Sequence, residues 1–460
     1  MKIGLVNLGC PKNLVDGEVM LGIAEQAGHE ITGDSSSADV IVVNTCAFID
    51  KAKQESIDTI LEMAQLKSGK ASRLVVTGCL AERYREELKK EIPEIDAVLG
   101  TGEVDRILAA LGSAPESAAV PMTFFRKEPA NSEQRAANSG LPTYLYDAET
   151  PRLLTTPRHF AYVKVAEGCD YTCAFCIIPT LRGKFRSRDA HSIVREARSL
   201  AARGVKELLL ISQDTTFYGI DKGEHGALAR LLRELNAVEG LEWIRLLYLY
   251  PTTITDDVLA AMAECEKVCR YIDLPLQHAS ASVLKRMRRP GDRKTYDKLL
   301  DRIRRTVSDV TLRTTFIVGF PGETEAEFGE LEQFISDVEF DHVGVFTYSH
   351  EEGTRAFATA DDVPAAIKRK RRNALMARQK KIVARAQKAK VGRVVHVLID
   401  GPSPEHELVL QGRLEGQAPD IDPLVILTDC DPSLYAAGDL IQARIVGSRD
   451  YDLVAEPLSS

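Results

Sequence analysis

Three cysteines, Cys169, Cys173 and Cys176, stand at C-x3-C-x2-C spacing in the string EGCDYTCAFCIIP. They directly follow a predicted strand, so they share one tight loop. Three thiolates on such a loop can hold three irons of a [4Fe-4S] cluster and leave the fourth iron open to bind another molecule. A zinc site would need a fourth cysteine or histidine close by, and His159 and His191 lie outside the loop. The spacing therefore predicts a reactive iron–sulfur cluster.

Three further cysteines each follow a different predicted strand: Cys10 ends NLGC, Cys46 ends VVNTC and Cys79 ends VVTGC. Because the carboxyl ends of parallel strands meet at one edge of a sheet, residues distant in sequence can converge there. Any one of these cysteines alone would more often be a core residue. Three in the same topological position predict a second three-thiolate site.

The hydrophobic pattern indicates the elements that must position these thiols. From residue 1 to 111, apolar runs such as DVIVVNT and RLVVTG alternate with amphipathic stretches. This alternation is typical of βαβ units and a parallel sheet. Residues 112–156 are rich in Ala, Ser, Pro and Asn, and we expect them to be a linker.

A second alternating series covers residues 157–362 and contains six predicted strands. It predicts a partial (β/α)6 barrel, related to the eightfold barrel whose chemistry lies at the carboxyl ends of its strands. Residues 363–390 form a predicted basic helix with 11 Lys or Arg, and residues 391–460 contain short β-like runs separated by Gly and Pro turns. We therefore expect an α/β protein with an N-terminal parallel-sheet domain, a central partial barrel and a small C-terminal β-barrel.

The composition is that of an ordinary globular protein: of 460 residues, 44% are hydrophobic and 27% are charged. This length predicts two or three domains. No apolar run reaches the roughly 18 residues of a membrane helix, and MKIGLVNLGC lacks the features of a signal peptide. We expect a cytoplasmic protein without membrane association, whose nine cysteines serve metal or thiol chemistry rather than disulfides.

The triplet, with Phe175 before its last cysteine, resembles the signature of the radical S-adenosylmethionine superfamily. The resemblance implies that the open iron binds S-adenosylmethionine and that an electron from the cluster cleaves it to a 5′-deoxyadenosyl radical. Cluster and cosubstrate would carry this chemistry, so no acid or base side chain is expected to be catalytic. The residues that the resemblance assigns to the cosubstrate are Phe175 at the adenine, Gln213 and Asp214 at the methionine end, and Gly319, Pro321 and Gly322 at the adenosine. For the last three, plain turn formation is an equal alternative.

The two cysteine trios together with a terminal β-barrel resemble the methylthiotransferase family over nearly the whole chain. LGCPKNLVDGE and NTCAFI are similar to its branch that modifies an aspartate of a ribosomal protein, although Gly17 stands where that motif usually has serine. The resemblance implies two [4Fe-4S] clusters, one held by Cys10, Cys46 and Cys79 and one by Cys169, Cys173 and Cys176.

The implied reaction replaces a C–H bond with C–SCH3 at the aspartate β-carbon. One S-adenosylmethionine is the methyl donor, another is the radical source, and a reductant such as a flavodoxin or ferredoxin supplies electrons. A non-catalytic iron–sulfur carrier is the rival interpretation, but a carrier would need neither an open iron nor a full barrel.

The charge of the C-terminal barrel bears on the substrate, because another branch of the family acts on a transfer-RNA adenosine. The terminal barrel resembles the TRAM module, which grips RNA with basic residues in those enzymes. Residues 391–460 contain four Arg, no Lys and twelve Asp or Glu, a net charge of −8. An acidic barrel would repel RNA and attract a basic protein, and QGRLEGQAPDID also resembles the protein-modifying branch. We therefore expect small-subunit ribosomal protein twelve as the partner, free or within the subunit, and no transfer RNA. Acidity that merely keeps the domain soluble is the alternative.

Several other residues have open roles. Four basic residues in PTLRGKFRSRD could pair with the substrate aspartate or with the cosubstrate carboxylate; they are Arg182, Lys184, Arg186 and Arg188. The basic helix could contact ribosomal RNA, but a charge run on a helix is usually a solvated face. Cys265 and Cys269, at i and i+4 of a predicted helix, and Cys430 fit neither cluster and are expected to be core or incidental thiols.

Overall fold

The computed structural model describes residues 1–112, 140–404 and 406–458. The expected linker falls mostly on residues 113–139, which lie outside this described part. The chain divides into two compact units. The first contains Met1–Thr155, Lys164–Thr172 and Cys176–Ile193, and the second contains Thr156–Val163, Cys173–Phe175 and Val194–Ser460. Among the described helices, none is both long enough and apolar enough to cross a membrane.

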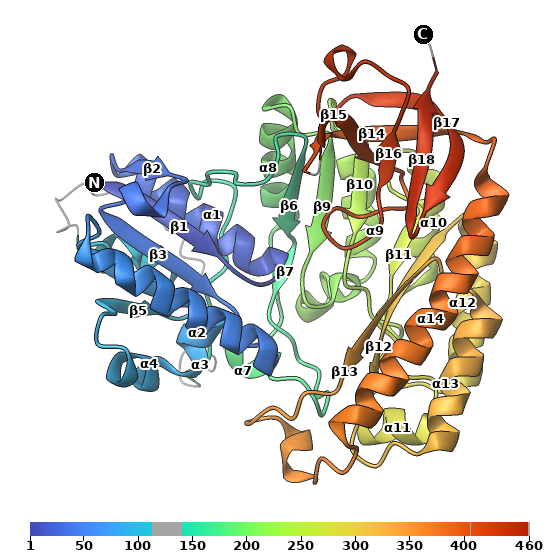
Figure 1. Cartoon of the computed structure of the whole chain (residues 1–460), viewed down its shortest axis with the longest axis horizontal. Helices are drawn as coiled ribbons and strands as arrows, with labels where there is room; N and C mark the ends of the chain where they lie inside the picture. The colour runs from blue at the N-terminus through green and yellow to red at the C-terminus, as the bar shows by residue number, and fades with distance from the viewer. Residues whose placement is uncertain (113–139, 405, 459–460) are drawn as a thin grey trace. The chain divides into compact units, whose positions relative to one another are not determined.

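A five-stranded parallel sheet of order β2-β1-β3-β4-β5 forms the core of the first unit (Figure 1). The strands are β1 (Lys2–Asn7), β2 (Glu30–Thr32), β3 (Val40–Thr45), β4 (Arg73–Gly78) and β5 (Ala97–Leu99). The central strand β3 is buried along its whole length, as expected of a parallel strand with both faces covered. This sheet confirms the N-terminal part of the predicted fold.

The helices of the first unit begin close after the strand ends. They are α1 (Pro11–Gln26), α2 (Asp50–Gln65), α3 (Cys79–Arg83), α4 (Arg85–Glu91), α5 (Ile107–Ala110) and the later α7 (Ile178–Arg182), with the short pair β7 (Ala166–Glu167) and β8 (Arg186–Ser187). Pro11 occupies the first turn of α1, where its fixed φ suits a helix start. Tyr84, at φ −132°, separates α3 from α4.

The second unit contains the six predicted strands, in two three-stranded sheets of order β10-β9-β6 and β11-β12-β13. The strands are β6 (Phe160–Lys164), β9 (Glu207–Ile211), β10 (Trp243–Leu246), β11 (Tyr271–Asp273), β12 (Thr311–Val318) and β13 (His342–Thr347). A single parallel bridge between Ile244 and Val268 links β10 to the chain entering β11. The partial barrel is therefore confirmed, with its weakest strand pairing at its middle.

Helices alternate with these strands, and Figure 1 shows the last two, α13 and α14, side by side. They are α8 (Ala190–Ala202), α9 (Ala227–Asn236), α10 (Asp256–Glu264), α11 (Ala281–Arg286), α12 (Arg293–Thr306), α13 (Glu325–Val338) and α14 (Ala365–Lys390). Helix α14 is the predicted basic helix. Most of its Lys and Arg side chains are exposed, while Lys368 and Arg371 are buried and paired with Asp361 and Glu323.

The C-terminal strands form a closed barrel of order β14-β15-β16-β18-β17. They are β14 (Val394–Ser403), β15 (His406–Arg413), β16 (Val425–Leu427), β17 (Leu440–Arg449) and β18 (Asp452–Pro457). Its small core is aliphatic, with Val397, Leu410 and Ile445 fully buried. This confirms the predicted small β-barrel.

The loop between β15 and β16, residues 414–424, is bonded to the strands of the partial barrel near their amino ends. Tyr271 donates to Asp422 at 2.6 Å and Arg313 donates to the same carboxylate at 3.1 Å. The further hydrogen bonds join Tyr162 to Asp420, Arg245 to the Glu415 carbonyl, the Arg270 amide to the Glu415 carboxylate, and His342 to the Gly416 carbonyl. We call the loop of residues 414–424 the barrel plug. The amino end of a barrel is where such contacts serve stability rather than chemistry.

Candidate functional site

The three N-terminal cysteines lie at the carboxyl edge of the first unit's sheet. Cys46 and Cys79 directly follow β3 and β4, and Cys10 follows β1 by three residues and precedes α1. In a sheet of order 2-1-3-4-5, the strand order reverses between β1 and β3, and ligands bind in the crevice outside the carboxyl ends there. The fold therefore places these three thiols where an α/β sheet offers a site.

The three thiols are close enough to interact. A Cβ added to Gly9 would lie 3.2 Å from Cys46 Sγ, so the Cys10 loop passes directly beside Cys46. Burial raises the pKa of Cys46, and the neighbouring Cys10 thiol adds to that rise. Burial raises the pKa of Cys79 to about 12, with Cys10 and Cys46 again adding and Arg182 opposing. The structure thus brings together the three cysteines that the sequence predicted from separate strands.

Two polar side chains of the first unit hold the cysteine loops in place. Ser56 of α2 accepts a hydrogen bond from the Cys46 amide at 3.0 Å and donates to the Cys46 carbonyl at 2.9 Å. Asn13 of α1 donates to the carbonyls of Leu8 at 3.1 Å and Thr45 at 2.7 Å. The Asn13 side chain is therefore bonded both to the loop that carries Cys10 and to the residue before Cys46.

Arg182 ends α7 and is completely enclosed beside Cys79. Its guanidinium donates to Asp16 at 2.9 Å, to Glu167 at 3.0 Å and to Asn13 Oδ1, and lies 3.7 Å from Cys79 Sγ. Lys164 pairs with the same two carboxylates. Two buried cations thus face two buried anions, so the charges compensate each other.

Arg182 is one of the four basic residues whose role the sequence leaves open, and its donors are engaged by residues of this chain. The other basic residues of PTLRGKFRSRD also have internal partners. Arg186 donates to the carbonyls of Lys184 and Tyr144, Arg188 lies over the Tyr146 ring and donates to the Lys164 carbonyl, and Lys184 lies 3.7 Å from Asp170. These contacts favour a structural role for the segment.

Gly78, directly before Cys79, has φ +92°, and a Cβ there would lie 2.5 Å from Asn44 Oδ1 and 2.6 Å from the Thr45 carbonyl. We expect Gly78→Ala to lower the free energy of unfolding by more than the roughly 1–3 kcal/mol of positive-φ strain alone. Gly28→Ala is the matched control, because Gly28 has φ +86° and no atom near its Cβ position. Urea denaturation measures both variants, and equal losses would contradict a steric role for Gly78 at the cysteine edge.

The predicted triplet is divided between the two units. In the first, the Cys169 amide donates to the Gly183 carbonyl at 3.0 Å. The preceding Gly168 has φ +85°, and its Cβ position is only 2.0 Å from the Lys184 carbonyl oxygen, so this close approach requires glycine. Cys176 directly precedes the turn into α7.

In the second unit, Cys173 has a buried arginine beside it that sequence reasoning missed. Arg289 Nη1 lies 3.9 Å from Cys173 Sγ, Nη2 donates to the Pro275 carbonyl at 2.6 Å, and the guanidinium stacks on the Tyr250 ring at 4.1 Å. The Ala174 amide donates to the Met287 carbonyl at 2.8 Å. The segment that carries Cys173 is thus fixed to the chain just after α11.

The predicted cosubstrate residues fall into two groups in the second unit. Phe175 packs against the apolar cluster that contains Phe320, Tyr348 and Met287, so it lies near the IVGFPGE turn. Gln213 and Asp214 follow β9, and the Asp214 carboxylate accepts hydrogen bonds from the Thr216 amide at 2.9 Å and the Thr253 hydroxyl at 3.1 Å. A barrel strand's carboxyl end is where the chemistry of such folds is located.

The glycines of the IVGFPGE turn are explained by the turn itself. Gly319 and Gly322 both have φ +74°, and a Cβ on Gly319 would lie 2.3 Å from Lys368 Cγ of α14. Pro321 is buried between them. The structure therefore shows turn formation and close helix packing here, and the contact of these three residues with adenosine stays a prediction.

The prediction that Cys265 and Cys269 share a helix is wrong. Helix α10 ends at Glu264, and Cys265 already has extended backbone because the chain turns toward β11. Both thiols are buried, and Cys430 packs beside the core of the C-terminal barrel. All nine cysteines are free of disulfides.

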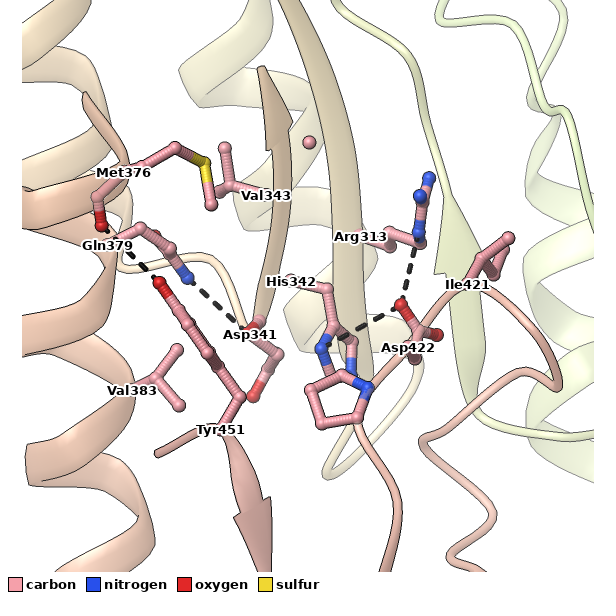
Figure 2. A pocket seen from close by; sticks show the side chains of 12 residues that line it. Arg313, Asp341, His342, Val343, Met376, Gln379, Val383, Ile421, Asp422 and Tyr451 are labelled. Atoms are coloured by element: carbon pink, nitrogen blue, oxygen red, sulfur yellow. Dashed lines mark hydrogen bonds and ion pairs between the residues drawn. The ribbon is translucent and has the colours of Figure 1, made fainter. Parts of the chain in front are cut away.

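A cavity of about 260 Å³ lies beside the amino ends of β12 and β13, and Figure 2 shows the residues that line it. It is lined by Arg313, Asp341, His342, Gln379, Asp422 and Tyr451 among others. In Figure 2 the Asp422 carboxylate points at Arg313 and His342. None of the predicted site residues lines this cavity, and part of its lining comes from the barrel plug.

The N-terminal donor set suits an iron–sulfur cluster. Within the described residues, no three Cys, His, Asp or Glu side chains are arranged to hold one ion. In a [4Fe-4S] cluster each thiolate binds a different iron, so its ligands need not converge on one point. At the N-terminal edge, three free thiols lie with a buried guanidinium beside one of them. This arrangement suits an anionic [4Fe-4S] cluster.

Three family models match the chain. The uncharacterized protein family UPF0004 matches residues 2–100, the radical SAM superfamily matches residues 163–335 and the TRAM domain matches residues 391–458. The radical S-adenosylmethionine methyltransferase TsrM from Kitasatospora setae is similar in fold, with a TM-score of 0.54 and 17% identity over 75% of this chain and 74% of that chain. The chain is thus built as a radical S-adenosylmethionine enzyme, whose cofactors are S-adenosylmethionine and a [4Fe-4S] cluster.

Curated relatives match along the whole length. The "Ribosomal protein uS12 methylthiotransferase RimO" of Koribacter versatilis (strain Ellin345) is 48% identical over 99% of this chain and 96% of the relative. The protein of the same description from Geobacter sulfurreducens (strain ATCC 51573 / DSM 12127 / PCA) is 45% identical over 100% of this chain and 99% of the relative. The chain belongs to the RimO family of methylthiotransferases, which confirms the family that the two cysteine trios predicted.

Proposed function

We propose that this protein methylthiolates the β-carbon of an aspartate in ribosomal protein uS12. The observation that carries the proposal is its 45–48% identity, over nearly the full length, to curated uS12 methylthiotransferases. The strong net negative charge of the C-terminal barrel supports a basic protein rather than RNA as the partner. Because its substrate would be a ribosomal protein, we propose that the enzyme is cytoplasmic.

We further propose that Cys169, Cys173 and Cys176 hold one [4Fe-4S] cluster and that Cys10, Cys46 and Cys79 hold a second. When bound, the two groups would supply an electron for cleavage of S-adenosylmethionine and a sulfur atom for transfer. The cosubstrate would be bound by Phe175, Gln213, Asp214 and the turn at Gly319, Pro321 and Gly322. A small reductant such as a flavodoxin or ferredoxin would deliver the electrons.

The chain's own residues would bind, orient and balance charge in this reaction. Arg289 beside Cys173 and Arg182 beside Cys79 each place a buried N–H group at a ligand sulfur. No side chain needs to act as acid or base for hydrogen abstraction. Of the six cysteines, Cys79 is buried and the other five are partly exposed.

The substrate is tested by incubating the reconstituted protein with S-adenosylmethionine and reductant. Isolated uS12, small ribosomal subunits and transfer RNA are offered in parallel, and products are weighed by mass spectrometry. We expect one methylthio group on an aspartate of uS12 and none on transfer RNA. Modified transfer RNA with unmodified uS12 would instead establish the adenosine-modifying activity. Formation of no 5′-deoxyadenosine at all would favour a non-catalytic carrier.

A further inference from the structure

We propose that Asn13 and Arg182 are the positioning residues of the N-terminal cysteine site: Asn13 sets the spacing of the three cysteine loops, and Arg182 places an N–H donor on the Cys79 sulfur. This inference rests on the proposed function, because it takes Cys10, Cys46 and Cys79 as cluster ligands. It goes further by naming two residues that bind neither iron nor cosubstrate.

The Asn13 side chain contacts all three cysteine segments. Its amide nitrogen donates to the Leu8 carbonyl, two residues before Cys10, and to the Thr45 carbonyl, directly before Cys46. Its amide oxygen lies 3.5 Å from Cys79 Sγ. Asn13 is almost completely buried, with a relative exposure of 1%. Removing it would leave two carbonyls without their donor and would release the three segments from one another.

The orientation of the Asn13 amide is determined by its partners. Two carbonyl oxygens require the nitrogen on one side, and the Arg182 donor requires the oxygen on the other. Asn44 adds a further restraint, because it donates to the Asn13 carbonyl at 2.7 Å and to Asn7 Oδ1 at 2.7 Å. An aspartate of the same shape would face the two carbonyls without donors, so only an amide fits.

The position of the Arg182 guanidinium is also determined by its partners. Asp16 and Glu167 accept from Nη1, and both carboxylates also bind Lys164. Helix α7 is fixed by Leu181, which is fully buried in the same core cluster as Cys79 and whose carbonyl accepts from Thr101 at 2.5 Å. With Nη1 fixed in this way, Nη2 points at Asn13 and Cys79. Hydrogen bonds to ligand sulfurs set the reduction potential of iron–sulfur clusters.

The experiment uses the full chain with Cys169, Cys173 and Cys176 replaced by alanine, so that only the N-terminal site can bind a cluster. After anaerobic reconstitution with iron and sulfide, this chain is expected to hold about four irons, and the unaltered chain about eight. If the triple variant binds no iron, the proposed N-terminal cluster fails, and the inference fails with it for that separate reason.

In this background, Asn13→Ala is expected to bind iron about 10–100-fold more weakly in competition with a chelator, as is typical when a ligand's supporting partner is lost. Asn236→Ala is the matched control, because the Asn236 side chain also makes a long-range hydrogen bond to the backbone, accepting from the Lys267 amide at 3.0 Å. Unchanged iron affinity in Asn13→Ala would overturn the role of Asn13.

Arg182→Lys keeps the positive charge but removes the fork that reaches both Asn13 and Cys79. We expect it to retain iron and to lower the midpoint potential of the remaining cluster, measured by redox titration. Arg188→Lys is the control, because Arg188 is buried in the same segment and donates to the Lys164 carbonyl and to Ser192. Equal potentials in the two variants would overturn the role of Arg182. This measurement also tests the proposal if Asn13→Ala does not fold.

Discussion

Replacing Cys46 with alanine is expected to leave reductive cleavage of S-adenosylmethionine intact while abolishing methylthio transfer, whereas Cys173→Ala is expected to abolish both. The reason is the proposed division of the six thiols. Cys173 belongs to the loop whose open iron would bind the cosubstrate, and Cys46 belongs to the edge where sulfur would be held. Quantifying 5′-deoxyadenosine and methylthiolated uS12 in the same reaction separates the two steps.

Cys430→Ala serves as the control for general thiol loss, because Cys430 lies beside the C-terminal barrel core and belongs to neither trio. It should retain both products. The interpretation would be refuted if Cys46→Ala and Cys173→Ala lost cleavage to the same extent.

Glu207→Gln is expected to destabilise the second unit by about 3–5 kcal/mol, as is typical when one partner of a buried ion pair is removed. Glu207 is fully buried and accepts from Arg245 at 2.7 Å and from Arg413 at 2.5 Å. Arg245 has no other recorded carboxylate partner among the described residues, so its charge would be left uncompensated. Urea denaturation measures the loss. Asp450→Asn, which breaks the exposed pair with Lys380, should cost under about 1 kcal/mol.

The same substitution should change the pH dependence of stability. Burial alone would raise the pKa of Glu207, but Arg413 and Arg245 hold it below its ordinary value of 4.5. A lowered native pKa means that the carboxylate's contribution is complete above the unfolded value and is lost as the pH falls below it toward the native value. Wild-type protein should therefore lose more stability than Glu207→Gln on acidification below about pH 4.5. Parallel acid curves would show that Glu207 does not contribute in this way.

The sequence was sufficient for the parts of the site that depend on spacing along the chain. Cys10, Cys46 and Cys79 each follow a strand whose apolar run is plain, and parallel strands end on one side, so their proximity followed from topology. Cys169, Cys173 and Cys176 are separated by only a few residues. The partial barrel and the terminal barrel were equally visible as alternating apolar runs.

The supporting residues could not be predicted, because their partners are remote in sequence. Arg182 lies 169 positions from Asn13, and Arg289 lies 116 positions from Cys173. Nothing in local periodicity indicates such pairs. The only signal for Asn13 was its place three residues after Cys10, on the first turn of α1.

Charge counting also had a limit. The acidic total of the C-terminal barrel includes carboxylates that are used inside the second unit: Asp400 binds Arg413 and His159, and Asp422 binds Arg313. The acidity that a partner could meet is carried by exposed residues such as Asp429, Asp431 and Asp439. A net charge cannot distinguish these two groups, because it contains no information about burial.

The barrel plug makes the terminal domain an integral part of the second unit rather than an appended module. Cutting the chain after α14 would remove Asp422 from Tyr271 and Arg313, the Gly416 carbonyl from His342, and Arg413 from Glu207. A truncated enzyme would thus be damaged throughout its second unit. Its inactivity would say nothing about where the ribosomal partner docks, and that surface has to be mapped by point substitutions on the outward side of the domain.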